Sequence, residues 1–333
     1  MVVPRILGVL GLVLVSLISC VSLPERPGYP GTGSIDPELF AQGVPITNWG
    51  YDAEDSTRYI QAAFDSEVPV LLFPAEPGIW VSDQLRLPSN KIILFAPGAI
   101  LEAKRGAFPG GGDMLLKGDV VQNLSILGYG AEIRMWKTDY QNPPYHPAEW
   151  RNTLGLYNSH NVLIEGLTLS SSGGDGVYLG AFQSEERSWN SDITLRNLHI
   201  RDHHRQGISV ISVKGLVVDS CLIEGTEGTP PGAGIDFEPN RPYEQLTEIR
   251  VMNTLIRNNQ GPGILFHFQF LDRTSTPVDI SIENTIVEGN LFNLSFMGVR
   301  KDPQGEIRFL DSTTPPPHFR LQRSISILGL EDS

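Results

Sequence analysis

The sequence predicts an all-β solenoid, a right-handed parallel β-helix with a short N-terminal capping helix. Three observations predict it: a strand-like unit that recurs between about residues 154 and 287, a second short strand after most copies, and glycines 27 to 31 residues apart. Repeats of this length are typical of solenoids, in which each coil buries its apolar side against its neighbours. Leucine-rich repeats are the main alternative, but the Leu-x-x-Leu-x-Leu-x-x-Asn pattern is absent.

The N-terminus has the features of an export signal. Arg5 precedes an almost wholly apolar run over residues 6–18, which is short of the about 20 residues that a membrane span needs. The run ends in Leu17-Ile18-Ser19-Cys20, which resembles the lipobox of bacterial lipoproteins. This resemblance implies that residues 1–19 are removed and that Cys20 carries lipid. In the alternative, the segment is an ordinary secretory peptide and Cys20 is incidental.

The rest of the chain is expected to form one domain behind a tether. Residues 20–34 are rich in Pro and Gly and predict a flexible tether, whereas 35–333 contain no second linker. By its resemblance to lipoproteins, the protein is expected to be exported and lipid-anchored in the bacterial cell envelope. Val21 after the cysteine resembles the signal for sorting to the outer membrane.

Residues 55–64 predict the capping helix. Asp55 is placed to act as its N-cap. Its apolar face comprises Tyr59, Ile60, Ala63 and Phe64. A helix here would cover the apolar end that the first coil otherwise exposes.

The recurring unit of the middle region has apolar residues at alternate positions, which indicates strands rather than helices. Its five copies are 162–166, 193–197, 216–220, 249–253 and 280–284. Second strands are predicted at Gly176–Leu179, Gly207–Val210, Gly234–Phe237 and Gly263–Phe266. Asn197, Asn253 and Asn284 share one register, and either stack their amides as a ladder or act as separate turn residues. Further strands are expected at 291–297, 307–310 and 325–328, in a less regular C-terminal end.

Charge and cysteine content exclude several classes of function. The net charge of −13 argues against nucleic-acid binding and against electrostatic binding to membranes. It does not exclude an anionic glycan, because a local basic site can outweigh the overall field. If Cys20 carries lipid, Cys221 is left alone, and a buried, unreactive thiol is expected there. No paired-cysteine metal site is present.

A candidate site is identified by polar residues at positions where the repeat does not need a polar side chain. Counted from each glycine, the second position holds Tyr178, Ser209, Asp236 and Leu265, and the fourth holds Gly180, Ile211, Glu238 and His267. Alternate residues of a strand face the same way, so Asp236 and Glu238 should share one outer face, with His267 beside Glu238 on the next coil. Asp175 and Arg205 lie just before two of the glycines and should converge on this side.

This combination suits the cleavage of polysaccharides. Two nearby carboxyl groups, one protonated and one ionised, are the machinery of glycoside hydrolysis. Asp236, Glu238 and Asp175 are therefore the candidate catalytic residues. Arg205 is a candidate anchor for a carboxylate or sulfate on the sugar. His267, Tyr178, Arg151 and Trp150 are further candidate substrate-binding residues. As plain alternatives, Asp175 is a turn residue, Arg205 pairs with Asp202, and the carboxylates form a solvated face.

Three stretches together carry a family resemblance: Ser172-Gly173-Gly174-Asp175-Gly176, Arg205-Gln206-Gly207-Ile208-Ser209 and Gly234-Ile235-Asp236-Phe237-Glu238-Pro239. They resemble bacterial right-handed parallel β-helix proteins of the pectate-lyase-like superfamily, over roughly residues 45–287. The resemblance implies a polysaccharide partner, and members include hydrolases, lyases, epimerases and phage tailspike glycosidases. The motif set of polygalacturonases is absent in order, as is the Asp-Pro-His motif of mannuronan epimerases.

We therefore expect a lipid-anchored enzyme that cleaves a polysaccharide, more readily a hydrolase than a lyase. No cofactor is expected for hydrolysis. A lyase would use Arg or Ca²⁺ to neutralise a uronic acid, and Asp175 and Asp236 would hold such an ion. A non-catalytic β-helix that binds glycan or builds the envelope is the alternative from another class. The sequence specifies neither the sugar nor the oligomeric state.

Overall fold

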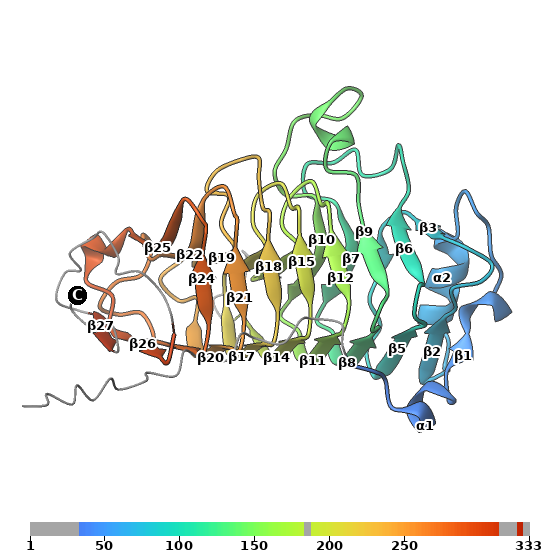
Figure 1. The fold of residues 1–333 in the computed structure, drawn as a ribbon, viewed down its shortest axis with the longest axis horizontal. Coiled ribbons are helices and arrows are strands. Elements are labelled where there is room, and N and C mark those ends of the chain that lie inside the picture. Colours follow the sequence, from blue (N-terminus) through green and yellow to red (C-terminus); the bar gives the residue numbers. More distant parts are fainter. Residues whose placement is uncertain (1–32, 183–187, 313–324, 329–333) are drawn as a thin grey trace, which may run out of the picture.

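The protein is a solenoid of three parallel sheets that run along one long axis (Figure 1). The computed structural model describes residues 33–182, 188–312 and 325–328. The predicted signal peptide, including Cys20, and nearly all of the predicted tether lie outside these residues. No helix in the described part of the chain is long and apolar enough to cross a bilayer.

Each full coil contributes one strand to each of the three sheets. We name the sheets A, B and C in the order in which the chain enters them. Sheet A contains β1 (Val44–Pro45), β2 (Val70–Phe73), β5 (Lys91–Phe95), β8 (Gln122–Leu127), β11 (His160–Glu165), β14 (Asn190–Arg196), β17 (Val213–Asp219), β20 (Leu246–Met252), β23 (Val278–Glu283), β26 (Gly305–Leu310) and β27 (Ile325–Leu328). Sheet B contains β3 (Trp80–Ser82), β6 (Ile100–Ala103), β9 (Glu132–Arg134), β12 (Thr168–Ser170), β15 (His199–Arg201), β18 (Leu222–Glu224), β21 (Leu255–Arg257) and β24 (Ile286–Glu288). Sheet C contains β4 (Leu85–Arg86), β7 (Met114–Asp119), β10 (Asn152–Tyr157), β13 (Val177–Gly180), β16 (Ile208–Val210), β19 (Ile235–Phe237), β22 (Pro262–His267) and β25 (Phe292–Met297).

The predicted repeat and its register are confirmed. The five copies form β11, β14, β17, β20 and β23, in which Val162 pairs with Ile193, Ile193 with Leu216 and Leu216 with Ile249. The second strands form β13, β16, β19 and β22 of sheet C. Most strands of sheet B are only three residues long, and such a short strand leaves little period-two signal in the sequence. The third sheet was therefore not predicted.

The interior is a continuous column of aliphatic and aromatic side chains. Residues equivalent in successive coils lie on top of one another, so like side chains stack along the axis. Phe237, Phe266 and Phe296 stack with ring centroids 5.4 and 4.7 Å apart. Cys221 is buried in this core, and burial raises the pKa of its thiol to about 12. The thiol is therefore protonated and unreactive, as the sequence predicted.

The amides of the turns between sheets A and B form a partial ladder. Asn197, Asn253 and Asn284 have φ angles of 52°, 52° and 43°. Asn284 donates a side-chain hydrogen bond to Asn253 Oδ1 at 2.9 Å, and Asn253 donates to Asp219 Oδ1 at 2.9 Å. Asn197 instead donates to the Tyr129 hydroxyl at 2.9 Å. Both interpretations, the amide ladder and the separate turn residues, are therefore correct in part. All three residues adopt left-handed backbone, but only the amides of Asn253 and Asn284 stack.

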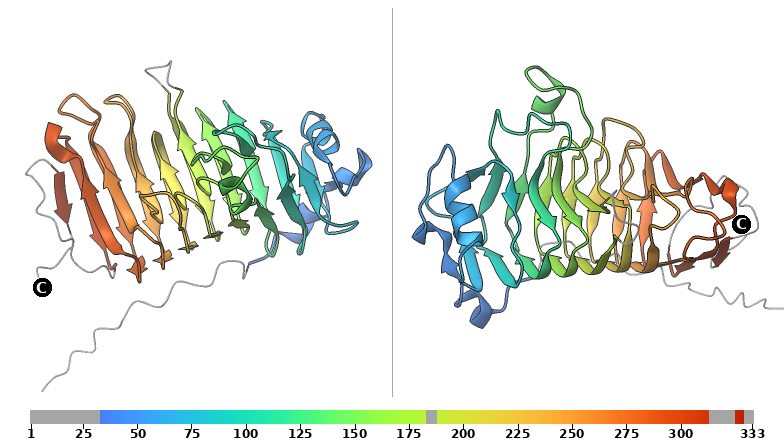
Figure 2. Two further views of the ribbon diagram at one scale, coloured as in Figure 1. Left: turned by 90° about the horizontal axis from the view of Figure 1, so that it is seen from above. Right: turned by 180° about the vertical axis from the view of Figure 1, so that it is seen from behind.

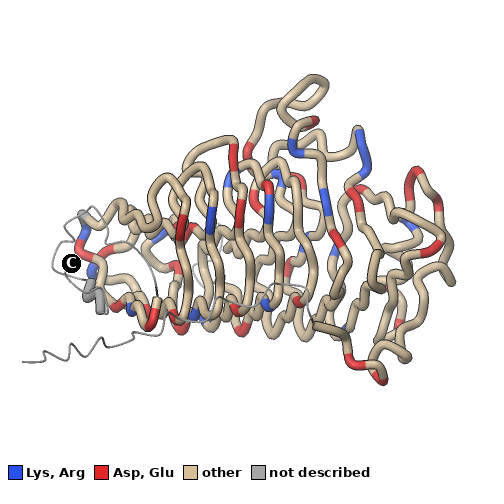
Figure 3. The backbone as a smooth tube through the Cα atoms, in the orientation of Figure 1, with Lys and Arg blue, Asp and Glu red and all other residues tan. Residues whose placement is uncertain are grey.

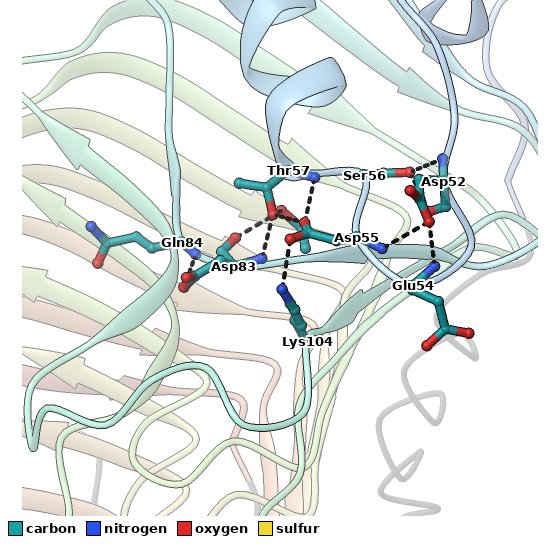
Figure 4. A network of polar contacts seen from close by, with 9 residues as sticks. Asp52, Glu54, Asp55, Ser56, Thr57, Asp83, Gln84 and Lys104 are labelled. Atoms are coloured by element: carbon teal, nitrogen blue, oxygen red, sulfur yellow. Dashed lines mark hydrogen bonds and ion pairs between the residues drawn. The ribbon is translucent and has the colours of Figure 1, made fainter.

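The predicted helix is α2 (Thr57–Phe64), which lies at the N-terminal end of the solenoid (Figures 1 and 2). It buries Ile60, Ala63 and Phe64. Its N-cap position is Ser56 rather than Asp55. Asp55 still accepts a hydrogen bond from the Thr57 backbone N–H at 3.0 Å, but it also binds Lys104 Nζ at 2.6 Å (Figure 4). This ion pair joins the start of the helix to the end of β6.

Four short helices complete the described elements: α1 (Pro37–Phe40), η1 (Ile46–Asn48), η2 (Asp139–Gln141) and η3 (Val299–Lys301). Of these, η2 lies in a long excursion between β9 and β10 that projects from the solenoid (Figure 1). The chain returns from this excursion through an isolated bridge between Arg151 and Gly173. The excursion therefore lies beside the loops that enter sheet C.

Candidate active site

Four stacked glycines define the coil position at which the candidate site begins. They are Gly176, Gly207, Gly234 and Gly263. A Cβ atom on Gly207 would lie 2.5 Å from the Gly234 carbonyl oxygen, and one on Gly234 would lie 2.7 Å from the Gly263 oxygen. Side chains are thus excluded because successive backbones approach too closely, which fixes the register of the residues around each glycine.

The register places the second-position residues in one row across sheet C. Tyr178 pairs with Ser209, Ser209 with Asp236 and Asp236 with Leu265, as predicted. Their neighbours along the strands, such as Ile235 and Phe237, point into the core. The row therefore lies on the outer face of sheet C. Loop residues nevertheless cover part of it, and Asp236 is fully buried.

Arg205 is the centre of the site. Its Nη2 donates a hydrogen bond to Glu238 Oε2 at 3.0 Å, and its Nη1 lies 3.7 Å from Asp175 Oδ2. Its Nε lies 4.0 Å from Glu149 Oε1. The Arg205 side chain is only 11% exposed. The predicted convergence of Asp175, Arg205 and Glu238 is thus present in the structure, and the Arg205–Asp202 pairing is not, because Asp202 binds Lys137 at 2.8 Å.

These contacts give Arg205 a different role from that of a free anion anchor. Its guanidinium already faces the carboxyl groups of Asp175, Glu238 and Glu149, and that of Asp236 lies nearby. A sugar carboxylate or sulfate would have to displace one of them. The arrangement instead indicates that Arg205 positions the carboxyl groups and offsets their mutual repulsion.

The two carboxyl groups proposed from the sequence have opposite electrostatic environments. Burial, together with the negative charge of Glu238, raises the pKa of Asp236 well above its usual value. Glu238 is also partly desolvated, but its contacts with His267 and Arg205 hold its pKa below the usual value. The His267 Nδ1 atom lies 3.1 Å from Glu238 Oε1, and this contact raises the pKa of His267. The environment of Asp236 therefore favours its protonated form, and that of Glu238 favours its ionised form.

Asp175 is deeply buried and poorly satisfied. Its backbone N–H donates to Asn152 Oδ1 at 2.6 Å, which fixes the loop before Gly176. Burial raises the pKa of its carboxyl group to about 7, against the opposing effect of Arg205. Ser209 also favours the charged form, but neither Asp175 oxygen accepts a hydrogen bond of ordinary geometry in the described structure. Asp175 is thus more than a solvated turn residue.

Sequence reasoning did not identify Gln206. Its Nε2 donates to Asp236 Oδ2 at 2.8 Å, and its Oε1 accepts the Ala233 backbone N–H at 2.7 Å. Gln206 is fully buried. The available signal was its position: like Asp175, it immediately precedes one of the stacked glycines, so it lies at the same place one coil later.

The predicted binding residues fall into two groups. Tyr178 lies on the outer face of sheet C beside Tyr157, with ring centroids 5.7 Å apart, and Tyr157 stacks on Phe182 at 5.7 Å. These three rings form an aromatic platform next to the carboxyl cluster, and burial raises the pKa of the Tyr178 hydroxyl. His267 is beside Glu238, as described.

Trp150 and Arg151 do not form the predicted sugar-stacking edge together. Trp150 is 51% exposed, whereas Arg151 is fully buried. The Arg151 guanidinium donates to the carbonyl oxygens of Phe108 at 2.9 Å and His146 at 3.0 Å. Arg151 is therefore a structural clamp on the excursion, because its Nε and Nη2 atoms donate to backbone carbonyl groups. Adjacent residues on an extended segment point in opposite directions, which is why only one of the pair reaches the surface.

His203 and His204 have structural contacts. His203 is fully buried, and its Nδ1 lies 2.8 Å from Ser172 Oγ. His204 Nε2 lies 2.9 Å from Thr229 Oγ1. Within the described residues, no group of three or more His, Cys, Asp and Glu side chains has an arrangement suited to a metal ion.

Comparison with known proteins agrees with this architecture. A family model described as "Right handed beta helix region" matches residues 147–297. The protein is a right-handed parallel β-helix. In sequence, this β-helix is 24% identical over 230 residues to the SPbeta prophage-derived uncharacterized protein YorA of Bacillus subtilis (strain 168). The match covers 64% of this chain and 38% of YorA, so the β-helix spans well under half of that relative's length.

Two solved structures share the fold. The family 28 exopolygalacturonase of Yersinia enterocolitica has a TM-score of 0.59 at 13% identity, over 87% of this chain and 66% of that one. The tailspike protein of E. coli bacteriophage HK620, in complex with a pentasaccharide, has a TM-score of 0.58 at 13% identity, over 87% and 53% of the two chains. At these identities the likeness shows a common fold, and fold alone does not define a reaction.

Proposed function

We propose that this β-helix cleaves a polysaccharide by hydrolysis on the outer face of sheet C. The observation that supports it most is the pair Asp236 and Glu238, which lie two residues apart and whose pKa values are driven in opposite directions. A protonated and an ionised carboxyl group at one site are the acid and the base that glycoside hydrolysis needs. The likeness to a polygalacturonase and a tailspike is consistent with such a substrate.

In the proposed mechanism, Glu238 acts on the attacking side of the sugar. Its side chain is 19% exposed and lies beside His267, so it is within reach of solvent and of a bound ligand. As the ionised partner, it would accept a proton from the attacking water in an inverting reaction, or attack the anomeric carbon in a retaining one. His267 and Arg205 keep it ionised.

Asp236 would supply the proton that the leaving oxygen requires. Its carboxyl group is fully buried, with Oδ2 held by Gln206 and Oδ1 unpartnered. Donation therefore requires side chains that cover Asp236, such as Gln206, to move aside when a sugar binds. The aromatic platform of Tyr157, Tyr178 and Phe182 offers apolar surface against which a sugar ring can pack beside this position.

The charge of the site favours a hydrolase over a lyase. A lyase must neutralise the carboxylate of a uronic acid before its base removes the C5 proton. Arg205 is the cation at the centre of this cluster, and its guanidinium is directed at Asp175, Glu238 and Glu149. Hydrolysis of a sugar without a carboxylate needs no such neutralisation.

The site is tested by conservative variants of the two carboxyl groups. Asp236→Asn and Glu238→Gln should each lower turnover at least about a hundredfold, the usual contribution of a general acid or base. Glu288→Gln on β24 of sheet B serves as the control, because its side chain is exposed and lies on another face. Full activity in both site variants would assign the cluster a structural role.

We further propose that the protein is anchored through lipid on Cys20 and faces the cell envelope, in the outer membrane. The proposal is supported by the apolar segment and the Leu-Ile-Ser-Cys sequence that ends at Cys20. Labelling of cells with an alkyne fatty acid should mark the wild type and leave Cys20→Ala unmarked. Labelling of both proteins would contradict the anchor, and fractionation of the membranes would locate the labelled protein.

A further inference from the structure

Sheet B carries a hollow made of two neighbouring cavities on its outer face. The first has a volume of about 360 Å³ and is lined by residues that include Glu132, Arg134, Trp136, Lys137, Arg201 and Asp202. The second has a volume of about 520 Å³ and is lined by residues that include Tyr51, Asp55, Ile79, Glu102, Lys104 and Arg105. We name the two cavities together the sheet B trough.

The trough follows the axis of the solenoid. Its lining residues come from β3, β6, β9, β12 and β15, which are consecutive strands of sheet B, and from the loops beside them. With a strand spacing of about 4.8 Å, these five strands span about 19 Å. The same strands form the labelled front face of Figure 1. A ligand that contacts the whole trough must therefore be elongated.

Arg105 and Trp136 connect the two cavities. The Arg105 guanidinium carbon lies 3.6 Å from the centroid of the Trp136 ring, and Arg105 also forms an ion pair with Asp139. Arg105 lines the second cavity, and Trp136 and Asp139 line the first. Trp136 is held in place because its Nε1 donates to the Ala103 carbonyl at 2.6 Å.

The charges that line the trough are nearly balanced. Acidic and basic residues can be seen side by side along this face (Figure 3). The first cavity has three cations, Arg134, Lys137 and Arg201, and three anions, Glu132, Asp139 and Asp202. The second has the cations Lys104 and Arg105 and the anions Glu54, Asp55 and Glu102. An electrostatic preference for a polyanion is therefore not expected.

Each of the five cations is also paired with a carboxylate. Lys137 binds Asp202 at 2.8 Å, Arg201 binds Glu132 at 2.8 Å, Arg134 binds Glu102 at 2.5 Å and Lys104 binds Asp55 at 2.6 Å. Arg105 pairs with Asp139. A sulfate or uronate would have to break one of these pairs to be neutralised. A hydroxyl group has no such requirement, since it can donate to a carboxylate and accept from a neighbouring guanidinium at once.

We propose that the sheet B trough binds a neutral polysaccharide chain laid along the solenoid axis. The alternating donors and acceptors suit rows of sugar hydroxyls, and the Tyr51 ring with the Ile79 side chain supplies apolar surface for sugar C–H groups. The described lining of the trough shares no residue with the carboxyl cluster of sheet C. Binding in the trough is thus independent of the proposed catalysis. It would hold the protein on its polysaccharide.

Two obstructing variants test this proposal without removing an ion pair. Thr138 and Ala53 are exposed and line the first and second cavity, respectively. Thr138→Trp and Ala53→Trp should each obstruct one cavity. Gln122→Trp adds the same side chain to an exposed position on β8 of sheet A and is the matched control. Asp236→Asn reports on the sheet C site, and thermal melting checks that every variant is folded.

Binding is measured with the full chain in mild detergent, by native electrophoresis through gels that contain hydroxyethyl cellulose, galactomannan, dextran, polygalacturonate or dextran sulfate. At least one neutral polymer should retard the wild type, and the two anionic polymers should not. Thr138→Trp and Ala53→Trp should weaken the interaction about tenfold or more, whereas Gln122→Trp and Asp236→Asn should bind as the wild type does.

Three results would overturn the proposal. The first is that no neutral polymer retards the wild type. The second is that only the anionic polymers do. The third is that retardation survives both trough variants but is lost in Asp236→Asn, which would place the binding site on sheet C. Failure of hydrolysis alone would leave the trough unaffected, so the two proposals can be distinguished.

Discussion

Glu238 and His267 contact each other across neighbouring strands, with Oε1 3.1 Å from Nδ1. His267 ends β22, and Glu238 directly follows β19. The contact lowers the pKa of Glu238 and raises that of His267. Asp236 lies only two residues from Glu238, yet burial raises its pKa. One short stretch of sheet thus places two carboxyl groups in environments that drive their pKa values in opposite directions.

The first prediction is a bell-shaped dependence of activity on pH. Activity should fall at acidic pH as Glu238 is protonated at its lowered pKa, and at alkaline pH as Asp236 loses its proton at its raised pKa. His267→Phe removes the hydrogen-bond partner that holds the pKa of Glu238 down, so this pKa should rise and the acidic limb should move up by about one unit. The measurement is kcat/KM against pH for both proteins.

His199→Phe is the matched control for that prediction. His199 Nε2 lies 2.8 Å from Glu224 Oε1 on sheet B, so the variant removes an equivalent pair away from sheet C. Its acidic limb should coincide with that of the wild type. An unchanged limb in His267→Phe would show that Glu238 is not the group that titrates.

The second prediction concerns the free energy of unfolding. Arg205→Met leaves Asp175, Asp236 and Glu238 without their shared cation, which should cost about 3 to 5 kcal/mol, as for other broken buried pairs. Arg196 bridges Glu165 and Asp219 on sheet A with a side chain that is 43% exposed. Arg196→Met should therefore cost less than about 1 kcal/mol.

Urea unfolding at acidic and at alkaline pH measures both arginine variants. The deficit of Arg205→Met should increase with pH, because ionised carboxylates need the cation and protonated ones do not. Equal deficits for the two variants would mean that Arg205 has no special place in the cluster.

The third prediction follows from Asp175. Its folded-state pKa of about 7 lies above the ordinary value of 3.8. The folded protein thus binds a proton that the unfolded chain has lost between these pH values. Wild-type stability therefore decreases as pH rises through this window, by up to a few kcal/mol, or roughly 1.4 kcal/mol per pKa unit. Asp175→Asn should lose this decrease.

Asp202→Asn should show the opposite sign. Although Asp202 is partly desolvated, Lys137 and Ser171 hold its pKa below the ordinary value. Wild-type stability from this group is lost as pH falls through the lowered pKa, so Asp202→Asn should lose stability relative to wild type only above that range. Parallel pH curves for the two variants would contradict both assignments.

The fourth prediction separates two contributions of Asn253 to stability, its left-handed backbone and its side-chain hydrogen bonds. Asn253→Ala must adopt a φ of 52° with a Cβ atom, and it loses two side-chain hydrogen bonds. Asn253→Gly loses the same bonds but has no Cβ strain. The Ala variant should be less stable than the Gly variant by about 1 kcal/mol, and both should be less stable than wild type by about 1 to 3 kcal/mol from the lost bonds. Thermal unfolding of the three proteins gives the comparison.

The sequence predicted two of the three sheets because their strands carry strong local signals. Apolar alternation over residues 249–253 and the glycine before Ile235 set both strand type and register. The third sheet has no comparable signal, because a strand such as His199–Arg201 is too short to show a period. Its position depends on the coil closing on itself.

The sequence predicted which residues form the site more completely than it predicted how these residues are buried. Counting from the glycines placed Asp236, Glu238 and His267 correctly, since the register follows from backbone contacts. It did not reveal that Arg205 is directed at three carboxylates or that Gln206 covers Asp236, because loop side chains decide these contacts. Arg151 was misplaced for the same reason: the excursion buries it against the carbonyl oxygens of Phe108 and His146.

The most direct test of the central claim is product release from a panel of neutral, uronic and sulfated polysaccharides by the full chain. Reducing ends and ultraviolet absorbance are read together, with Asp236→Asn and Glu238→Gln as controls. The proposed hydrolase predicts new reducing ends without absorbance, lost in both variants. Products that absorb would carry an unsaturated uronic end and would identify a lyase. No product from any polysaccharide would contradict catalysis and leave a β-helix that only binds glycan or builds the envelope.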